Sequence, residues 1–549
     1  MNGSRSALLD LAQSLSARRL DRRGLFKRAG ALGVSVPTLT ALLRGFGEAA
    51  AQETGSGGTL VFDLGSEPEN LDPHQALAYT TSRLIEQTCE PLIYLGPETL
   101  DVNPWLAESW ESSEDGLQWT FTLRQGVTFH DASDFNAEAV KFSFERQLKP
   151  DHPYFKLGQW SNASRLAFIE EIRVDAEHVV TFLLSEPYNK FLSRMANSPA
   201  GRIVSKQAVE THGDKFLENP VGTGPYAFDR WDKGQQVVLR RNEDYWGGRP
   251  SLDQVVFKAI AEDGARLAAL LSGEVHMSLD VSAEIVERLR TSEDHTVISG
   301  PTGAVWFLAM NVESEPFQDV RVRQAVNYAV DKRAIVEDVL KGTVEIAYGP
   351  LSPAYQEFNP KLMEMYPFDP ERARQLLEEA NFPTDREVVF RSSIGGSGML
   401  SPEEMATVIQ DNLREVGMRT RLEVTEFVSW MDAIRNPQNE LTVMSWNIPP
   451  IEPDTMFTGI LTESALPPGF NTSYWVNEEF EQLIADARRA LDPEVAKEKY
   501  YRAQEIVMEE APIVPVCHRQ QVYGVSNRVK NFSPNPSMEL NLRQTYLEG

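Results

Sequence analysis

The first half of the chain carries short runs in which hydrophobic and polar residues alternate, a pattern that predicts β-strands between turns. Helices are expected near residues 79–88 and after Asn136, because an asparagine side chain can accept a hydrogen bond from the free N–H groups of a helix start. The first half is therefore predicted to be mixed α and β. The expected strands cover residues 59–62, 119–123, 179–184 and 236–240.

From about residue 301 the hydrophobic spacing changes to three and four residues, which predicts amphipathic helices. The longest helical stretch, residues 319–340, is expected to break near residues 330–332. Alternation of helices and strands predicts α/β layers and a second major domain. The other elements expected here are helices at 370–380 and 404–416 and strands at 387–390 and 421–424.

Residues 1–51 are predicted to be a signal peptide. They contain eight Lys and Arg against three Asp and Glu, whereas the whole chain has 53 against 80. The pair Arg22-Arg23 precedes a weakly apolar stretch, which resembles a twin-arginine signal; a Sec signal and an N-terminal amphipathic helix are the alternatives. With no cysteine near the cleavage region, we expect an exported, soluble protein without a lipid anchor, either periplasmic or secreted.

Composition and charge exclude several classes of function. The chain has 549 residues and a formal charge of -27, which opposes binding to nucleic acid. Cys89 and Cys517 are the two cysteines, and we expect two free thiols in preference to one disulfide. The eight histidines are far apart and no nucleophile or phosphate-loop motif occurs, so we expect no metal, no cofactor and no enzyme.

Several motifs occur in one order along nearly the whole mature chain. Each motif alone also fits a hairpin or an amphipathic core helix. Together they resemble family 5 of the extracellular solute-binding proteins, which includes oligopeptide, dipeptide and nickel receptors. The motifs are NLDPH (70–74), PWLAESW (104–110), LRQGVTFHD (123–131), FNAE (135–138), GTGPY (222–226), RNEDYW (241–246) and PFQDVRVRQAVNYAVDK (316–332).

The resemblance implies an α/β, two-lobed periplasmic-binding-protein-like fold of type II (cluster C) with an extra inserted domain. It implies the receptor of an ABC importer, a monomer that captures a peptide or other small polar solute by hinge closure. A membrane permease with cytoplasmic ATPases would receive the solute. The implied parts are a discontinuous domain I (52–95, 205–300 and 512–549), an inserted domain II (96–204) and a domain III (301–511).

The resemblance also implies a ligand site between the lobes. One wall would pair its backbone with the ligand. The other would offer an aromatic surface, although core packing is the alternative for its tryptophan, Trp446. The implied residues are Leu77, Ala78 and Tyr79 on the first wall, Ser445, Trp446 and Asn447 on the second, and Phe427, Trp430 and Asp454 beside it.

The chain departs from the peptide-receptor pattern at one position. Peptide receptors of this family carry an aspartate for the ligand ammonium three residues after the tryptophan, and this chain has Pro449. Glu452 and Asp454 could take over that role, or they could be solvated loop residues. A peptide and an oligosaccharide both remain possible ligands. A secreted hydrolase, a chaperone or a signalling receptor could also be built on the same scaffold.

Overall fold

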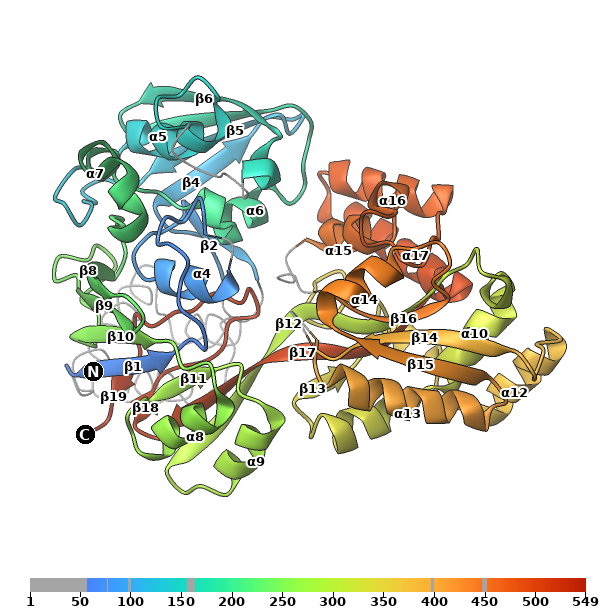
Figure 1. The fold of residues 1–549 in the computed structure, drawn as a ribbon. Helices are drawn as coiled ribbons and strands as arrows, with labels where there is room; N and C mark the ends of the chain where they lie inside the picture. The colour runs from blue at the N-terminus through green and yellow to red at the C-terminus, as the bar shows by residue number, and fades with distance from the viewer. Residues whose placement is uncertain (1–56, 77, 97–99, 156–162, 396–398, 447–451) are drawn as a thin grey trace, which may run out of the picture. The chain divides into compact units, whose positions relative to one another are not determined.

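The computed structural model of the protein describes residues 57–549 except 77, 97–99, 156–162, 396–398 and 447–451 (Figure 1). The predicted signal peptide, residues 1–51, lies outside the described residues. No described helix combines the length and the apolar character needed to cross a membrane. Cys89 and Cys517 are buried free thiols, and burial raises the pKa of each to about 12.

A large mixed sheet forms the centre of the described fold. Its strands run in the order β15-β14-β16-β12-β17-β11-β1-β10-β9-β8, with β13 attached to β17. The strands predicted at 59–62, 236–240, 387–390 and 421–424 all belong to it. Their bounds are β1 Thr59–Asp63, β8 Tyr226–Asp232, β9 Gln236–Arg241, β10 Gln254–Lys258, β11 Met277–Leu279, β12 His295–Met310, β13 Val344–Ile346, β14 Glu387–Ser393, β15 Arg419–Thr425, β16 Leu441–Trp446 and β17 Ile513–Ser526.

Strands β12 and β17 belong to both halves of this sheet (Figure 1). Residues 295–301 of β12 pair with residues 520–526 of β17, on the side where β11 and β1 follow. Beyond a register shift between Pro301 and Val305, β12 pairs with residues 513–518 of β17 and, on its other edge, with β16. The chain thus passes from the first lobe to the second in β12 and returns in β17.

A second sheet, in the order β4-β5-β7-β6, belongs to the first lobe. Its aromatic core includes Phe121 and Phe182, whose rings meet edge to face at 5.6 Å. Helix α5 packs on it and begins as predicted, because the side chain of Asn136 accepts a hydrogen bond from Ala139 N. The elements are β4 Ala107–Ser112, β5 Gln118–Leu123, α5 Ala137–Leu148, β6 Ile169–Ala176, β7 Val179–Leu184 and α6 Phe191–Asn197; β2 Ile93–Leu95, β3 Val102–Pro104 and α7 Lys206–His212 lie nearby in the chain.

Helices surround the sheet of the second lobe. The predicted break of the long helix is confirmed: α10 ends at Ala329, and the side chain of Asp331 caps the next helix by accepting from Ala334 N. The helix predicted at 79–88 is shorter than expected. The helices of the second lobe are α10 Val320–Ala329, α11 Lys332–Ala334, α12 Pro370–Glu379, α13 Pro402–Glu415, α14 Phe427–Ile434, α15 Pro453–Ile460, α16 Glu478–Arg489 and α17 Pro493–Glu510. The first lobe also contains α4 Tyr79–Ile85, α8 Asp263–Leu271 and α9 Ala283–Arg290.

Candidate functional site

Three strands of the second lobe end at one edge of the sheet. β14 runs parallel to both β15 and β16, so their carboxyl ends lie together. Trp446 ends β16 and pairs with Val305 of β12, directly beside the register shift. In open α/β sheets the crevice outside the carboxyl ends of the strands is the usual ligand site. We call this edge, with Ile394, Phe427, Val428, Ser445 and Trp446, the strand-end site.

Trp446 is half-buried at the strand-end site. Its ring lies 5.2 Å from that of Phe470, and it packs on the backbone of Gly459 in α15. A Cβ atom built on Gly459 would be 2.4 Å from Cζ2 of Trp446, closer than atoms can approach. Glycine at position 459 therefore provides the space that the tryptophan ring occupies.

The two aromatic residues predicted on α14 have different surroundings. Trp430 is 1% exposed and its Nε1 donates to Oγ1 of Thr442 at 3.2 Å, so in this structure it is a core residue. Phe427 is half-buried, with its ring 5.4 Å from that of Trp430. Sequence reasoning missed Val428 and Ile394, which are 73% and 54% exposed. Such exposure of large apolar side chains beside the ends of β14 and β15 is typical of a contact surface.

The predicted first wall lies at the start of α4. Both backbone groups of Ala78 are engaged, since its N–H donates to Oε1 of Glu69 at 2.9 Å and its carbonyl accepts from Ser82 N. Backbone pairing of a ligand with the N–H of Ala78 would require Glu69 to withdraw. Leu77, Asn447 and Pro449 lie outside the described residues, as does the side chain of Tyr79.

Asp454 is a buried residue in the first turn of α15. It is 4% exposed and Glu452 is 5% exposed, so the interpretation of both as solvated loop residues is wrong. Oδ1 of Asp454 has no hydrogen-bond partner in the part of the chain that the structure describes. Burial and the neighbouring carboxylate of Glu452 raise the pKa of Asp454 to about 6. Asp454 lines a cavity of about 450 Å³ together with Tyr188, Arg194 and Arg488.

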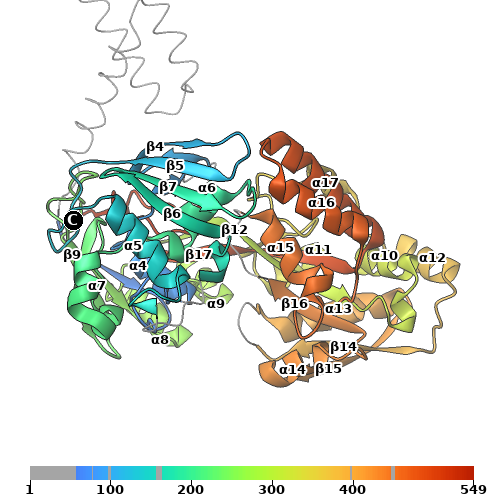
Figure 2. The same ribbon diagram turned by 90° about the horizontal axis from the view of Figure 1, so that it is seen from above.

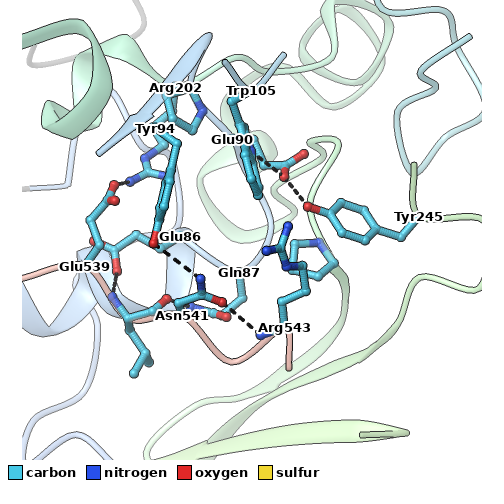
Figure 3. A pocket seen from close by; sticks show the side chains of 13 residues that line it. Glu86, Gln87, Glu90, Tyr94, Trp105, Arg202, Tyr245, Glu539, Asn541 and Arg543 are labelled. Carbon is cyan, nitrogen blue, oxygen red and sulfur yellow. Dashed lines mark hydrogen bonds and ion pairs between the residues drawn. The ribbon is translucent and has the colours of Figure 1, made fainter. Parts of the chain in front are cut away.

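A second, much smaller cavity of about 40 Å³ is lined by residues that follow α4, among them Glu86 and Glu90 (Figure 3). The carboxylate of Glu90 accepts four hydrogen bonds there, and Arg202 forms an ion pair with Glu539. Glu86 accepts from Leu540 N at 2.6 Å, and burial raises the pKa of Glu86 to about 7. The donors to Glu90 are Trp105 Nε1 (2.8 Å), Tyr245 OH (2.5 Å), Thr223 Oγ1 (2.7 Å) and Trp246 Nε1 (2.9 Å).

These contacts join α4 and its following loop to residues 539–540 near the C-terminus. Glu86, Glu90, Arg202 and Glu539 all have hydrogen-bond or ion-pair partners within the protein. The cavity is also smaller than the 300 Å³ or more of typical ligand pockets. We therefore interpret this buried cluster as structural. Across the described ranges, no group of three or more His, Cys, Asp or Glu residues is placed to hold a metal ion.

Comparison with known proteins identifies the family. Residues 101–466 match the model of the bacterial extracellular solute-binding proteins, family 5, middle region. The chain belongs to the family 5 solute-binding proteins. Family 5 consists of substrate-binding proteins, and the predicted role of this member as the receptor of an ABC importer is confirmed.

Several family 5 relatives match over nearly their full length. The chain is 31% identical to di/tripeptide-binding protein 2 of Pseudomonas aeruginosa, covering 87% of this chain and 93% of the relative. It is also 31% identical to heme-binding protein A of Haemophilus influenzae, covering 88% and 91%. The solved structure of HbpA2 from Haemophilus parasuis aligns with a TM-score of 0.83 at 26% identity, covering 89% of this chain and 100% of that one. The two-lobed α/β fold predicted from the sequence is confirmed.

Proposed function

We propose that the protein is exported and binds a small peptide at the strand-end site. The observation that carries this proposal is the position of Trp446, half-buried at the end of β16 and beside the register shift of β12. A ligand held there lies beside β12, the strand that pairs with Trp446 and continues into the first lobe. Its free energy of binding can therefore favour one arrangement of the lobes, as a transport receptor requires.

The proposal includes the domain boundaries and the closing motion. Domain I would comprise 52–95, 205–300 and 512–549, domain II 96–204 and domain III 301–511. The register shift between Pro301 and Val305 is the proposed hinge, because a shifted ladder has fewer backbone hydrogen bonds to resist bending. Leu77, Tyr79 and Asn447 remain predicted ligand contacts.

Peptide is favoured as the ligand class by the name of the Pseudomonas relative, and haem is the competing class by the name of the Haemophilus relative. A flat haem group needs a broad apolar surface and an iron ligand. The apolar side chains of the strand-end site could cover one face of such a group. None of the five described residues that define the site is a His, Cys, Met or Tyr that could ligate iron, which favours the peptide.

Native mass spectrometry of the protein purified from its own host tests the proposal. A bound mass in the range of di- to tetrapeptides that is released on unfolding would support it, and Trp446→Ala should reduce the bound fraction. Haem would be recognised by its mass and its strong visible absorbance, and would replace peptide as the ligand class. The same samples should show no turnover of peptide or glycoside substrates, since we propose that the protein is not an enzyme.

Export is proposed from the N-terminal residues. Because Arg22-Arg23 precedes a short apolar stretch, the twin-arginine route is favoured over the Sec route. Replacing both arginines with lysine should retain the full-length protein in the cytoplasm, whereas a Sec substrate would tolerate the change. The periplasmic fraction of the two proteins, measured by immunoblot, distinguishes the routes.

A further inference from the structure

A short segment that follows β7 and includes the first turn of α6, residues 186–194, reaches the second lobe. Asn189 donates its backbone N–H to the carbonyl of Arg488 at 3.0 Å and its Nδ2 to the carbonyl of Ala487 at 2.8 Å. These carbonyls belong to the last turn of α16, where the regular helical hydrogen bonds end, and that of Ala487 also accepts from Ala490 N at 3.2 Å. Both views place α6 on the side of the first lobe that faces α15 and α16 (Figure 2).

Ion pairs flank these hydrogen bonds. Nζ of Lys190 lies 2.5 Å from Oε1 of Glu357, with side chains 15% and 9% exposed. Arg194 forms an ion pair with Glu452, with side chains 13% and 7% exposed. Arg488 of α16 lies 3.2 Å from Glu186, in a more exposed third pair.

Tyr188 lies in the middle of this contact. It is 1% exposed, and the guanidinium groups of Arg194 and Arg488 lie 5.9 and 5.0 Å from its ring centroid. Its hydroxyl oxygen accepts from Nη2 of Arg194 at 3.2 Å. Cations from the two lobes therefore lie over one aromatic ring, in reach of favourable cation–π contact.

We propose that residues 186–194, together with Glu357, Glu452 and Arg488, form a clasp that stabilises the closed arrangement of the two lobes without contacting the ligand. The pairs that carry it are largely dehydrated, so the charge left when one partner is removed strongly disfavours the closed arrangement. Exposed ion pairs, by comparison, contribute little. The clasp is thus a conformational device distinct from the strand-end site.

Helix α15 connects the clasp to the strand-end site. Glu452 precedes its first residue and pairs with Arg194, whereas Gly459 near its other end supports the ring of Trp446. One short helix therefore contacts the opposite lobe at one end and the ligand wall at the other. Closing the clasp fixes the position of the surface against which Trp446 packs.

The test measures the distance between the lobes in ligand-free protein. Cys89 and Cys517 are each 0% exposed, so spin labels can be directed to exposed cysteines introduced as Glu210→Cys in the first lobe and Glu404→Cys in the second. Double electron–electron resonance then reports the distance distribution, after the protein has been unfolded to release copurified ligand and refolded. We expect a narrow short-distance population, which is the closed arrangement, as a measurable fraction of the otherwise unchanged protein.

Arg194→Met should add a population at longer distance, and Lys190→Met should do the same through an independent pair. The double variant Arg194→Glu with Glu452→Arg should restore the narrow population. Arg173→Met is the matched control, because Arg173 pairs with Asp175 in its own strand, and its distribution should not change. Circular dichroism confirms that each variant is folded.

A short-distance population that is undiminished in both Arg194→Met and Lys190→Met would overturn the clasp, as would its absence from the parent protein. Neither outcome depends on which ligand the protein transports. Failure of the clasp would therefore leave the proposed function intact, and the absence of any bound peptide would leave the clasp intact.

Discussion

The space beside Gly459 offers a direct test of how the strand-end site is built. The Gly459→Ala substitution would place a methyl group 2.4 Å from Cζ2, 2.8 Å from Cε2 and 3.1 Å from Nε1 of Trp446. Ordinary contact needs about 3.5–4 Å, so the ring must retreat by roughly 1 Å. Overpacking of this kind costs about 1–3 kcal/mol, partly offset by about 1 kcal/mol because alanine favours a helix more than glycine does.

The same substitution should behave differently when the indole is gone. In a Trp446→Leu background the clashing atoms are absent, so Gly459→Ala should raise stability by the helix preference alone. The coupling free energy of the double-mutant cycle should therefore be about 1–3 kcal/mol. For a cooperative unit of this size roughly 1 kcal/mol corresponds to 1 °C in the melting temperature, which differential scanning calorimetry resolves.

Ligand binding supplies the second measurement. With the ring displaced, Gly459→Ala should weaken the affinity for the ligand recovered by native mass spectrometry, measured by isothermal titration calorimetry. Gly395→Ala is the control, because no described atom lies within 4 Å of the added methyl group. Equal changes in melting temperature from Gly459→Ala in the two backgrounds would refute the packing argument.

Three further predictions concern buried carboxylates. Burial raises the pKa of Glu86 to about 7, so the folded state binds more protons than the unfolded state between about pH 4.5 and 7, and the free energy of unfolding falls as pH rises through that window. Glu86→Gln removes this loss, so it should stabilise the protein more at pH 8 than at pH 5, by up to about 3 kcal/mol in the free energy of unfolding, seen as a higher melting temperature. An equal effect at both pH values would contradict this. Asp454 lies beside the clasp, where burial and Glu452 raise its pKa to about 6 against the opposing effect of Arg194 and Arg488. Protonation therefore favours the closed arrangement, so the short-distance population should grow as pH falls from 7 to 5, and Asp454→Asn should abolish that dependence in the same resonance experiment. Glu90→Gln replaces an acceptor of four hydrogen bonds with a group that can accept fewer, so we expect a loss of about 2 kcal/mol or more in calorimetry, whereas the exposed Glu210→Gln should change little.

Local signals predicted the secondary structure well. The break after α10 follows from Asp331, whose side chain caps the next helix, and the start of α5 follows from Asn136 in the same way. Each signal depends on residues only three positions apart. Strand positions were found for a similar reason, since alternation along five or six residues reflects one buried face.

Long-range contacts were outside the reach of such patterns. Arg194 and Glu452 are 258 positions apart, and the donors to Glu90 come from up to 156 positions away. Trp430 and Trp446 both occur in apolar segments, and only the fold shows that the first is in the core and the second is half-buried at a strand end. Aspartate is a residue type common in loops, and only the fold shows that Asp454 is buried and lines one cavity with Tyr188 and Arg194, more than 250 positions away in the chain.

The structure of the crossing explains why a clasp is useful in this fold. Between Pro301 and Val305 the β12–β17 ladder is interrupted, and side chains replace it: Thr302 Oγ1 donates to the carbonyl of Arg519 at 2.6 Å. Two strands joined by an interrupted ladder resist bending weakly. They therefore determine the direction in which the lobes rotate more than how far the lobes close. Contacts far from the crossing act with a longer lever arm. Ion pairs at residues 186–194 are therefore well placed to set how completely the lobes close, while Trp446, near the axis, contacts the ligand.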